Sequence, residues 1–155
     1  MKRILTLLAL CLAVTAASAQ NAIFKKYAER NDVDYVCVTR AMLRFGGGLT
    51  SSGLSVNGVN VARIAKNLNN ILIIDADKPA PLRQMRDDYA ALRRDEAYEV
   101  LMEARSDGEV SVTLFNSTAS PMEFVVYVQD KSEATFIVMT GKFSDEDISH
   151  LINAD

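Results

Sequence analysis

The most regular pattern of apolar and polar positions in the chain lies between residues 98 and 143, where four strand-like segments follow one another with short turn signals between them. Residues 99–105 and 109–115 each alternate with a period of two, which is typical of strands with one buried face. Their apolar positions are Val100, Met102, Ala104, Val110, Val112 and Leu114. The pattern predicts a meander of four antiparallel strands.

The register of the first hairpin depends on the length of its connection. A two-residue turn would place the two apolar sets on opposite faces of the sheet, because side chains alternate between the faces. A three-residue loop over 106–108 instead pairs Ala104 with Val110 and keeps both sets on one face. It also sets Arg105 across from Glu109, an opposite-charge pair. The sequence therefore predicts the three-residue loop.

The second hairpin, in strands 122–141 around a turn at 130–133, is apolar on both faces. One face would pair Phe124 with Met139, Val126 with Ile137 and Val128 with Thr135, and the reverse face Tyr127 with Phe136 and Val125 with Val138. Strands of this composition lie near the centre of a sheet and are covered on both sides. A bare face would be a sticky binding surface. The structural interpretation is that the protein's own helices or loops cover both faces of this hairpin. The alternative is that one face is exposed and binds a partner.

The segments before and after the meander predict two more strands, at 33–39 and 71–75. Helices are expected at about 21–31, 60–68, 81–94 and 144–153, the last with a cap of the S-x-x-D type. A helical crossover between the two strands would make them parallel. The predicted fold is α+β: a single domain over 20–155, with a mostly antiparallel twisted sheet covered by about four helices.

The N-terminus has the pattern of an export signal. A short basic start at Lys2 and Arg3 is followed by an apolar run over 4–16 and by small residues up to Ala19. This predicts a secretory signal peptide cleaved after Ala19, so that 1–19 is removed and the protein is periplasmic or extracellular. The apolar run is shorter than the roughly 20 residues of a membrane-spanning helix, and we expect no membrane span elsewhere.

The charge and the cysteine content of the chain limit the classes of partner that it can bind and the reactions of its thiol groups. The chain carries 17 Lys and Arg against 20 Asp and Glu. The predicted leader contains Lys2 and Arg3 and no acid, so the exported chain is more acidic still. This argues against a nucleic-acid partner, which requires a basic face. Only Cys37 lies beyond the leader, in an apolar strand. We therefore predict a buried, unreactive core thiol and no intramolecular disulfide.

Residues able to hold a metal or to catalyse are few. His150 is the only histidine and falls on the polar side of the last helix, so common zinc sites cannot be assembled. The acidic pairs Asp32/Asp34 and Asp75/Asp77 could bind calcium or magnesium weakly, although carboxylates at strand ends more often mark the exit into a loop. We therefore predict no metal, cofactor or catalytic residues, and a protein that is not an enzyme.

The segment Gly46–Gly53 is rich in glycine but lacks the spacing of a phosphate-binding loop. Successive glycines give the chain no stiffness, so we predict a mobile connector.

Several features together resemble the domain of unknown function 4252 family of small exported bacterial proteins. They are a leader, a helix with Phe24-x-x-Tyr27, an apolar strand at 71–74, Tyr98-Glu-Val-Leu-Met followed by Asp107-Gly108, and the helix start Ser144-Asp-Glu-Asp-Ile. The resemblance implies export and a compact α+β shape. It implies no catalytic residues.

Three functions from different classes remain open at this point. The first is a non-enzymatic exported envelope protein that binds a partner protein or peptide, as a monomer or weak homodimer. The alternative is a carrier or sensor of an apolar small molecule held between sheet and helices. The third is an enzyme that uses carboxylates or a bound metal. A flat exposed apolar face would favour the first, a deep apolar cavity the second and converging acids the third.

Overall fold

The computed structural model describes residues 22–45, 55–56, 59–60, 67–106, 109–117 and 121–152. Contacts divide the chain into two units, Met1–Asn31 and Asp32–Asp155. The predicted leader over 1–19 and the predicted mobile connector Gly46–Gly53 lie outside the described residues, so both stay predictions.

The first unit contains a short helix, α2 (Ala22–Lys25), that continues into the 3-10 turn η1 (Lys26–Glu29). The helix predicted over 21–31 is therefore shorter than expected, because Arg30 already adopts an extended backbone. Phe24 and Tyr27 are buried, three positions apart, as their helical spacing predicts.

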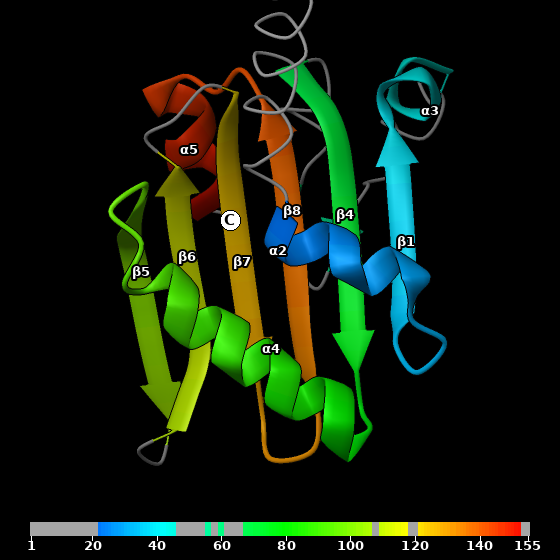
Figure 1. Cartoon of the computed structure of the whole chain (residues 1–155). Helices are drawn as coiled ribbons and strands as arrows, with labels where there is room; N and C mark the ends of the chain where they lie inside the picture. The colour runs from blue at the N-terminus through cyan, green and yellow to red at the C-terminus, as the bar shows by residue number, and fades with distance from the viewer. Residues whose placement is uncertain are drawn as a thin grey trace, which may run out of the picture. The chain divides into compact units, whose positions relative to one another are not determined.

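The second unit is built on an open six-stranded sheet, which confirms the α+β fold (Figure 1). Its strands are β1 (Asp34–Thr39), β4 (Leu68–Ala76), β5 (Tyr98–Ser106), β6 (Glu109–Ser117), β7 (Met122–Gln129) and β8 (Ala134–Gly141). They lie in the order β1-β4-β8-β7-β6-β5, and all neighbours pair antiparallel. The predicted meander forms the consecutive part of this order, and the two earlier strands extend it at β8.

The prediction that the strands at 33–39 and 71–75 run parallel is wrong. β1 and β4 pair antiparallel, and Thr39 at the end of β1 lies opposite Asn70 near the start of β4. The chain therefore leaves and re-enters the sheet at the same end. A parallel crossover needs about a dozen residues or more, and the connection over 40–67 is long enough for one, so its length did not decide the direction of β4. The helix that follows β1 directly, α3 (Arg40–Phe45), has only 6 residues.

The prediction of a helix over 60–68 is wrong at both ends, because the first and last residues of this range belong to strands. Asn60 closes β3 (Val59–Asn60), which pairs with β2 (Ser55–Val56) in a separate two-stranded sheet. Leu68 is already the first residue of β4. Residues 61–66 lie outside the described residues. Leu68, the last apolar position of the predicted helix, is therefore part of a strand.

The two hairpins of the meander differ in how well their register was predicted. β7 and β8 pair as predicted on both faces. In the first hairpin the prediction is wrong, because Arg105 faces Val110 rather than Glu109, and Ala104 faces Val112. The register shifts by one residue between these two pairs. This β-bulge brings Met102 and Ala104 to the face of Val112 and Leu114, which is the effect that the prediction assigned to a longer loop. A second shift sets Val100 opposite Phe115 on the other face.

Helix α4 (Pro79–Leu92) lies across one face of the sheet, close to its predicted bounds (Figure 1). The Tyr89 ring stacks on Tyr127 of β7 at 4.4 Å between centroids and meets Phe115 of β6 edge-on at 5.9 Å. Tyr127, Val125, Phe136 and Val138 are all buried. The reverse face of the second hairpin is therefore covered, as the structural interpretation predicts, and does not form an exposed binding surface.

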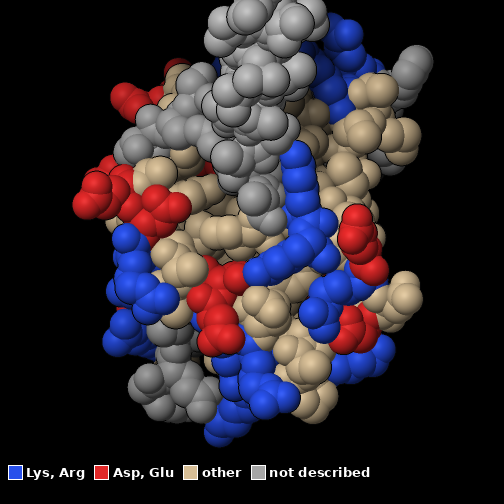
Figure 2. Space-filling model, in the orientation of Figure 1, with Lys and Arg blue, Asp and Glu red and all other residues tan. Residues whose placement is uncertain are grey.

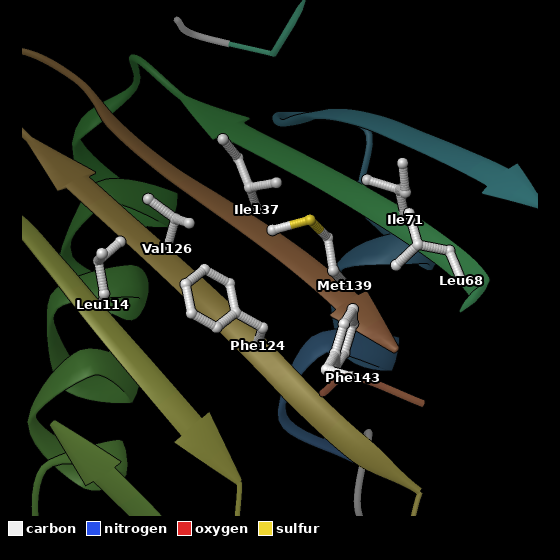
Figure 3. Close-up of a cluster of buried hydrophobic side chains, with 8 residues drawn as sticks. All are labelled: Leu68, Ile71, Leu114, Phe124, Val126, Ile137, Met139 and Phe143. Atoms are coloured by element: carbon white, nitrogen blue, oxygen red, sulfur yellow. The ribbon is translucent and has the colours of Figure 1, made fainter. Parts of the chain in front are cut away.

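A cluster of apolar side chains occupies the opposite face of the sheet (Figure 3). Its members are Leu68, Ile71, Leu114, Phe124, Val126, Ile137, Met139 and Phe143. Leu43 of α3 and Ile148 of α5 (Asp145–Ile152) pack against it. The sheet thus has a hydrophobic core on each side, as strands with two apolar faces require. No helix in the described part of the chain is both long and apolar enough to cross a membrane.

Helix α5 begins with the predicted cap. The Asp147 amide donates to Ser144 Oγ at 3.1 Å, and the Ser144 amide donates back to Asp147 Oδ2 at 2.9 Å. These reciprocal bonds satisfy amides that the helix itself leaves unpaired. The side chain of His150 lies outside the described residues, so its predicted orientation stays a prediction.

Candidate functional site

The acidic residues singled out from the sequence are only partly brought together. Asp34 of β1 lies directly opposite Asp75 of β4, so one acid from each predicted pair meets across the strands. Asp75 also accepts a hydrogen bond from Thr135 Oγ1 at 2.6 Å. Asp77 lies beyond the end of β4. Among the described residues, no group of three or more acidic, histidine or cysteine side chains could hold a metal ion.

The prediction that Cys37 is a buried core residue is wrong, because its side chain is exposed. β1 is an edge strand, and it pairs only with β4 among the described residues. Val36 beside it is 50% exposed. An apolar run shows that a segment forms a strand, but it does not distinguish an edge from the centre of a sheet. A Cys37→Ser substitution is therefore not expected to carry the cost of burying a hydroxyl group.

An open hollow of about 620 Å³ lies where α4 begins beside the turn that joins β7 to β8. Its lining residues are Asp77, Pro79, Leu82, Arg83, Arg86, Lys131 and Ser132. In Figure 1 this place is the lower end of the sheet, and in Figure 2 Lys and Arg side chains gather at the lower end of the same face. The hollow thus combines side chains from two segments that are distant in the sequence.

The β7–β8 turn is held by one carboxylate. Asp130 Oδ1 accepts the backbone amides of Ser132 at 2.7 Å and Glu133 at 2.8 Å, and also the Ser132 hydroxyl at 3.1 Å. These backbone hydrogen bonds hold the pKa of Asp130 below its usual value. A turn of this kind is locally determined. It presents Lys131 to the hollow and keeps the Asp130 carboxylate engaged within the turn itself.

The cations of the hollow outnumber its one acid, Asp77, and none of them is in an ion pair with a described residue. Within the described residues, Arg83, Arg86 and Lys131 take part in no ion pair. Arg93, at the other end of α4, contrasts with them, since it forms a salt bridge with Glu103 and donates to Tyr89 Oη at 2.8 Å. The guanidinium of Arg93 lowers the pKa of Glu103. The arginine that follows the last residue of α4 is therefore paired, whereas Arg83 and Arg86 within the helix form no ion pair with a described residue.

The sequence did not predict this hollow. The sequence places Arg83 and Arg86 on one face of a helix. Lys131 is distant in the sequence, and no local pattern indicates that it lies near them. One signal was available: the first turn of α4 contains no acidic residue, and Lys78 at its N-cap makes no side-chain capping bond. Helices usually carry acids at this end, because the helix dipole is positive there.

A second group missed by sequence reasoning is a polar row that crosses the α4 face of the sheet. Tyr98 pairs with Ser117, Glu123 with Thr140, Thr140 with Asn70, and Asn70 with Thr39. One polar residue from each of the six strands therefore lies along one line. The row shares the α4 face because Glu123 is an even number of positions from Tyr127. No alternation pattern within a single strand shows such a row, since it runs perpendicular to the strands.

Glu123 is the centre of this row and is completely buried. Tyr98 Oη donates to Glu123 Oε2 at 2.5 Å. Glu123 Oε1, Thr140 Oγ1 and Asn70 Oδ1 are buried and have no hydrogen-bond partner among the described residues. Burial raises the pKa of the Glu123 carboxyl, and the hydrogen bond from Tyr98 opposes that rise only in part. Glu123 therefore keeps its proton to higher pH than an exposed glutamate does.

We expect Glu123→Gln to stabilise the protein at pH 7 by about 1 kcal/mol, because the amide carries no charge to desolvate and can donate to Thr140 Oγ1. Since the folded-state pKa of Glu123 lies above 4.5, the stability of the unmutated protein falls as pH rises from about 4.5 through that pKa. The variant lacks this fall, so the two stabilities should converge at low pH. Urea unfolding from pH 3 to pH 8 measures this difference.

The matched control is Glu99→Gln, on the exposed side of β5, which should leave the pH dependence unchanged. A Glu123→Gln variant that is less stable than the unmutated protein at pH 7 would contradict the argument.

Comparison with known proteins places the chain in a family but supplies no function. No curated protein and no solved structure matches it. A family model described as Domain of unknown function (DUF4252) matches residues 27–151, which include all six strands of the large sheet. This match confirms the resemblance found in the sequence. The chain therefore belongs to the family Domain of unknown function (DUF4252).

Proposed function

We propose that the protein is a non-enzymatic exported binding protein that recognises an acidic segment of a partner protein or peptide in the hollow at the start of α4. The observation that carries this proposal is the presence of three cations in one hollow without an ion-pair partner among the described residues. They are Arg83, Arg86 and Lys131. The chain as a whole has a net charge of −3, so this local excess of positive charge is opposite in sign to the rest of the protein.

The position of the cations on α4 supports a binding role. Arg83 and Arg86 are the fifth and eighth residues of α4, and the N-terminus of the helix itself lines the hollow through Pro79. An anion bound in the hollow would interact favourably both with the dipole and with the two guanidinium groups. Pro79 and Pro81 lack amide hydrogens, so the side chains rather than the helix backbone would provide most of the hydrogen bonds. Arginine suits this role because its planar fork binds carboxylates in a bidentate manner.

The shape of the hollow favours a short segment of a partner. Its volume of about 620 Å³ lies within the range of about 300–1,000 Å³ that is usual for ligand sites. Asp77 contributes one negative charge, which leaves the lining with an excess of two positive charges. A long polyanion such as a nucleic acid would meet the acidic remainder of the protein, whereas two or three adjacent carboxylates would not.

The groups that line the hollow supply charge rather than catalysis. Arginine stays protonated at any physiological pH and cannot act as a base. The Ser132 hydroxyl donates to Asp130 Oδ1, but this oxygen also accepts two backbone amides of the turn, and these bonds lower the pKa of Asp130 and make it a weak base. Export is the part of the proposal that rests on the leader pattern of residues 1–19.

Binding of a fluorescent hexaglutamate peptide, followed by anisotropy, tests this proposal. We expect binding at low salt that weakens as salt is added, because exposed charges are screened. The double variant Arg83→Gln/Arg86→Gln should lose about tenfold or more in affinity, since each lost charge-assisted hydrogen bond weakens binding substantially. Arg94→Gln removes an exposed arginine that does not line the hollow and should bind like the unmutated protein.

An equal loss of affinity in Arg94→Gln would show that only overall charge matters, and would overturn the proposed site. So would a protein that binds no acidic peptide at low salt. Competition by inorganic phosphate as strong as that by free glutamate peptide would redirect the proposal from carboxylates to phosphate groups.

A further inference from the structure

The outer edge of β1 lacks the features that normally prevent sheet edges from pairing. Its register with β4 runs through six consecutive pairs without a bulge. The strand contains no proline and no lysine, and Asp34 is its only charged residue. Val36 is 50% exposed, and Met42 in the helix that follows is 58% exposed. An edge of this kind is suited to pair with another strand.

The other edge of the sheet, β5, is protected. Its register with β6 shifts twice, between Val100 and Met102 and between Ala104 and Arg105. Bulges at an edge disrupt the row of backbone groups that a further strand would need. β5 also carries Glu99, Glu103 and Arg105 along its length. Only the β1 edge combines regular backbone geometry with exposed apolar side chains.

The sequence of β1 is complementary to itself in one register. When two copies of an edge strand continue a sheet antiparallel, opposite residues must lie on the same face, so the pairing must be centred on a residue. A centre at Val36 sets Asp34 against Val38, and a centre at Val38 sets Val36 against Arg40. A centre at Cys37 pairs Val36 with Val38 and Tyr35 with Thr39, and places Asp34 next to Arg40, the first residue of α3. Only this last register matches apolar with apolar residues and acid with base.

The charges of Asp34 at the start of β1 and of Arg40 just after its end favour the same register. Asp34 lies directly opposite Asp75 on β4, and like charges in this position repel each other. Neither Asp34 nor Arg40 has an ion-pair partner within the described part of the chain. Arg40 of a second copy would be placed beside Asp34 and would offset this repulsion, and the two-fold symmetry provides the contact twice.

We propose that the protein forms a two-fold homodimer in which the β1 edges of two copies pair antiparallel about Cys37. The two sheets become one continuous sheet across the dimer. Backbone hydrogen bonds along β1 provide the contact, and the Asp34–Arg40 pairs set its register. The hollow is lined by α4 and the β7–β8 turn rather than by β1, so this inference does not depend on the proposed function.

Charge exchange tests both the interface and its register. In sedimentation velocity over a range of protein concentrations, Asp34→Arg and Arg40→Asp should each raise the dimer dissociation constant by about tenfold or more, because like charges then face each other twice. The double variant Asp34→Arg/Arg40→Asp should restore dimerisation. A variant that merely misfolds would not be rescued by a second substitution, and circular dichroism of each variant confirms folding.

Cross-linking at Cys37 gives an independent measurement. In a chain carrying Cys11→Ser, a short bismaleimide should join two copies through Cys37, which is exposed. Val36→Lys places a charge at a half-exposed edge position and should abolish cross-linking while the monomer stays folded. A protein that is monomeric at all concentrations overturns the proposal. A dimer that is indifferent to the charge exchange, or whose Cys37 thiols cannot be joined, does so as well.

Discussion

Replacing Val138 with aspartate should abolish folding. Val138 is fully buried at the centre of the sheet, where it faces Leu72 of β4 and Val125 of β7. A carboxylate at this position would have no polar partner on the apolar strands beside it. An unpaired buried charge costs several kcal/mol, against a total stability of about 5–15 kcal/mol. Far-UV circular dichroism and the melting temperature of the purified variant measure the effect.

Val100→Asp is the matched control, because Val100 lies on the edge strand β5 and is 40% exposed. It should change the melting temperature little. If Val138→Asp is a folded monomer and has lost an association that the unmutated protein shows, the argument that Val138 belongs to the core is contradicted. That outcome would make the second hairpin an interface rather than part of the core.

Replacing Gly141 with alanine should destabilise the protein by about 1–3 kcal/mol, the usual range for forcing extra atoms into a packed site. A Cβ at this position would lie 2.3 Å from the backbone oxygen of Asn67 and 3.1 Å from Leu68 Cα. Both are backbone atoms of the entry to β4, so no side-chain rotation can relieve the contact. The Lys142 amide donates to the same Asn67 oxygen at 3.0 Å and holds the two strands together there.

Urea denaturation measures the effect of Gly141→Ala, with a lower midpoint and an unchanged slope as the expected result. Lys142→Ala, at the exposed next position, keeps the amide bond to Asn67 and should leave the midpoint nearly unchanged. The register of β4 with β8 shifts between Leu68 and Asn70. A Gly141→Ala midpoint equal to that of the unmutated protein would show that β4 moves freely at this β-bulge and so contradict the argument.

The second hairpin shows what a local pattern can predict. β7 and β8 are joined by the short turn at 130–133, and this turn sets the register, because strands with two apolar faces would match in other registers as well. The first hairpin has one apolar face, and its faces can be matched either by an extra loop residue or by a bulge. The structure uses the bulge between Arg105 and Ala104. The two solutions have the same pattern of apolar positions, so the sequence could not distinguish them.

The candidate site was less predictable than the fold. Arg83 and Arg86 were evident as one face of a helix, but Lys131 joins them only because the β7–β8 turn and the start of α4 meet at one end of the sheet. The polar row through Glu123 crosses six strands, and its members become neighbours only when the strand order is known. Contacts perpendicular to the strands leave no periodic signal along the chain.

The sequence by itself determined which segments form strands and helices in most of the described chain, the α+β class, the cap of α5 and the register of β7 with β8. These features depend on interactions between residues close in the chain, such as those in the turn at 130–133, or on the periodic spacing of apolar positions. Only the tertiary structure decided that β1 is an antiparallel edge strand with an exposed Cys37, that Glu123 is buried, and that three cations share a hollow. The physical reason is that an apolar strand has the same local preference at the edge as at the centre. Burial and charge pairing are set by whichever strands and helices pack beside it.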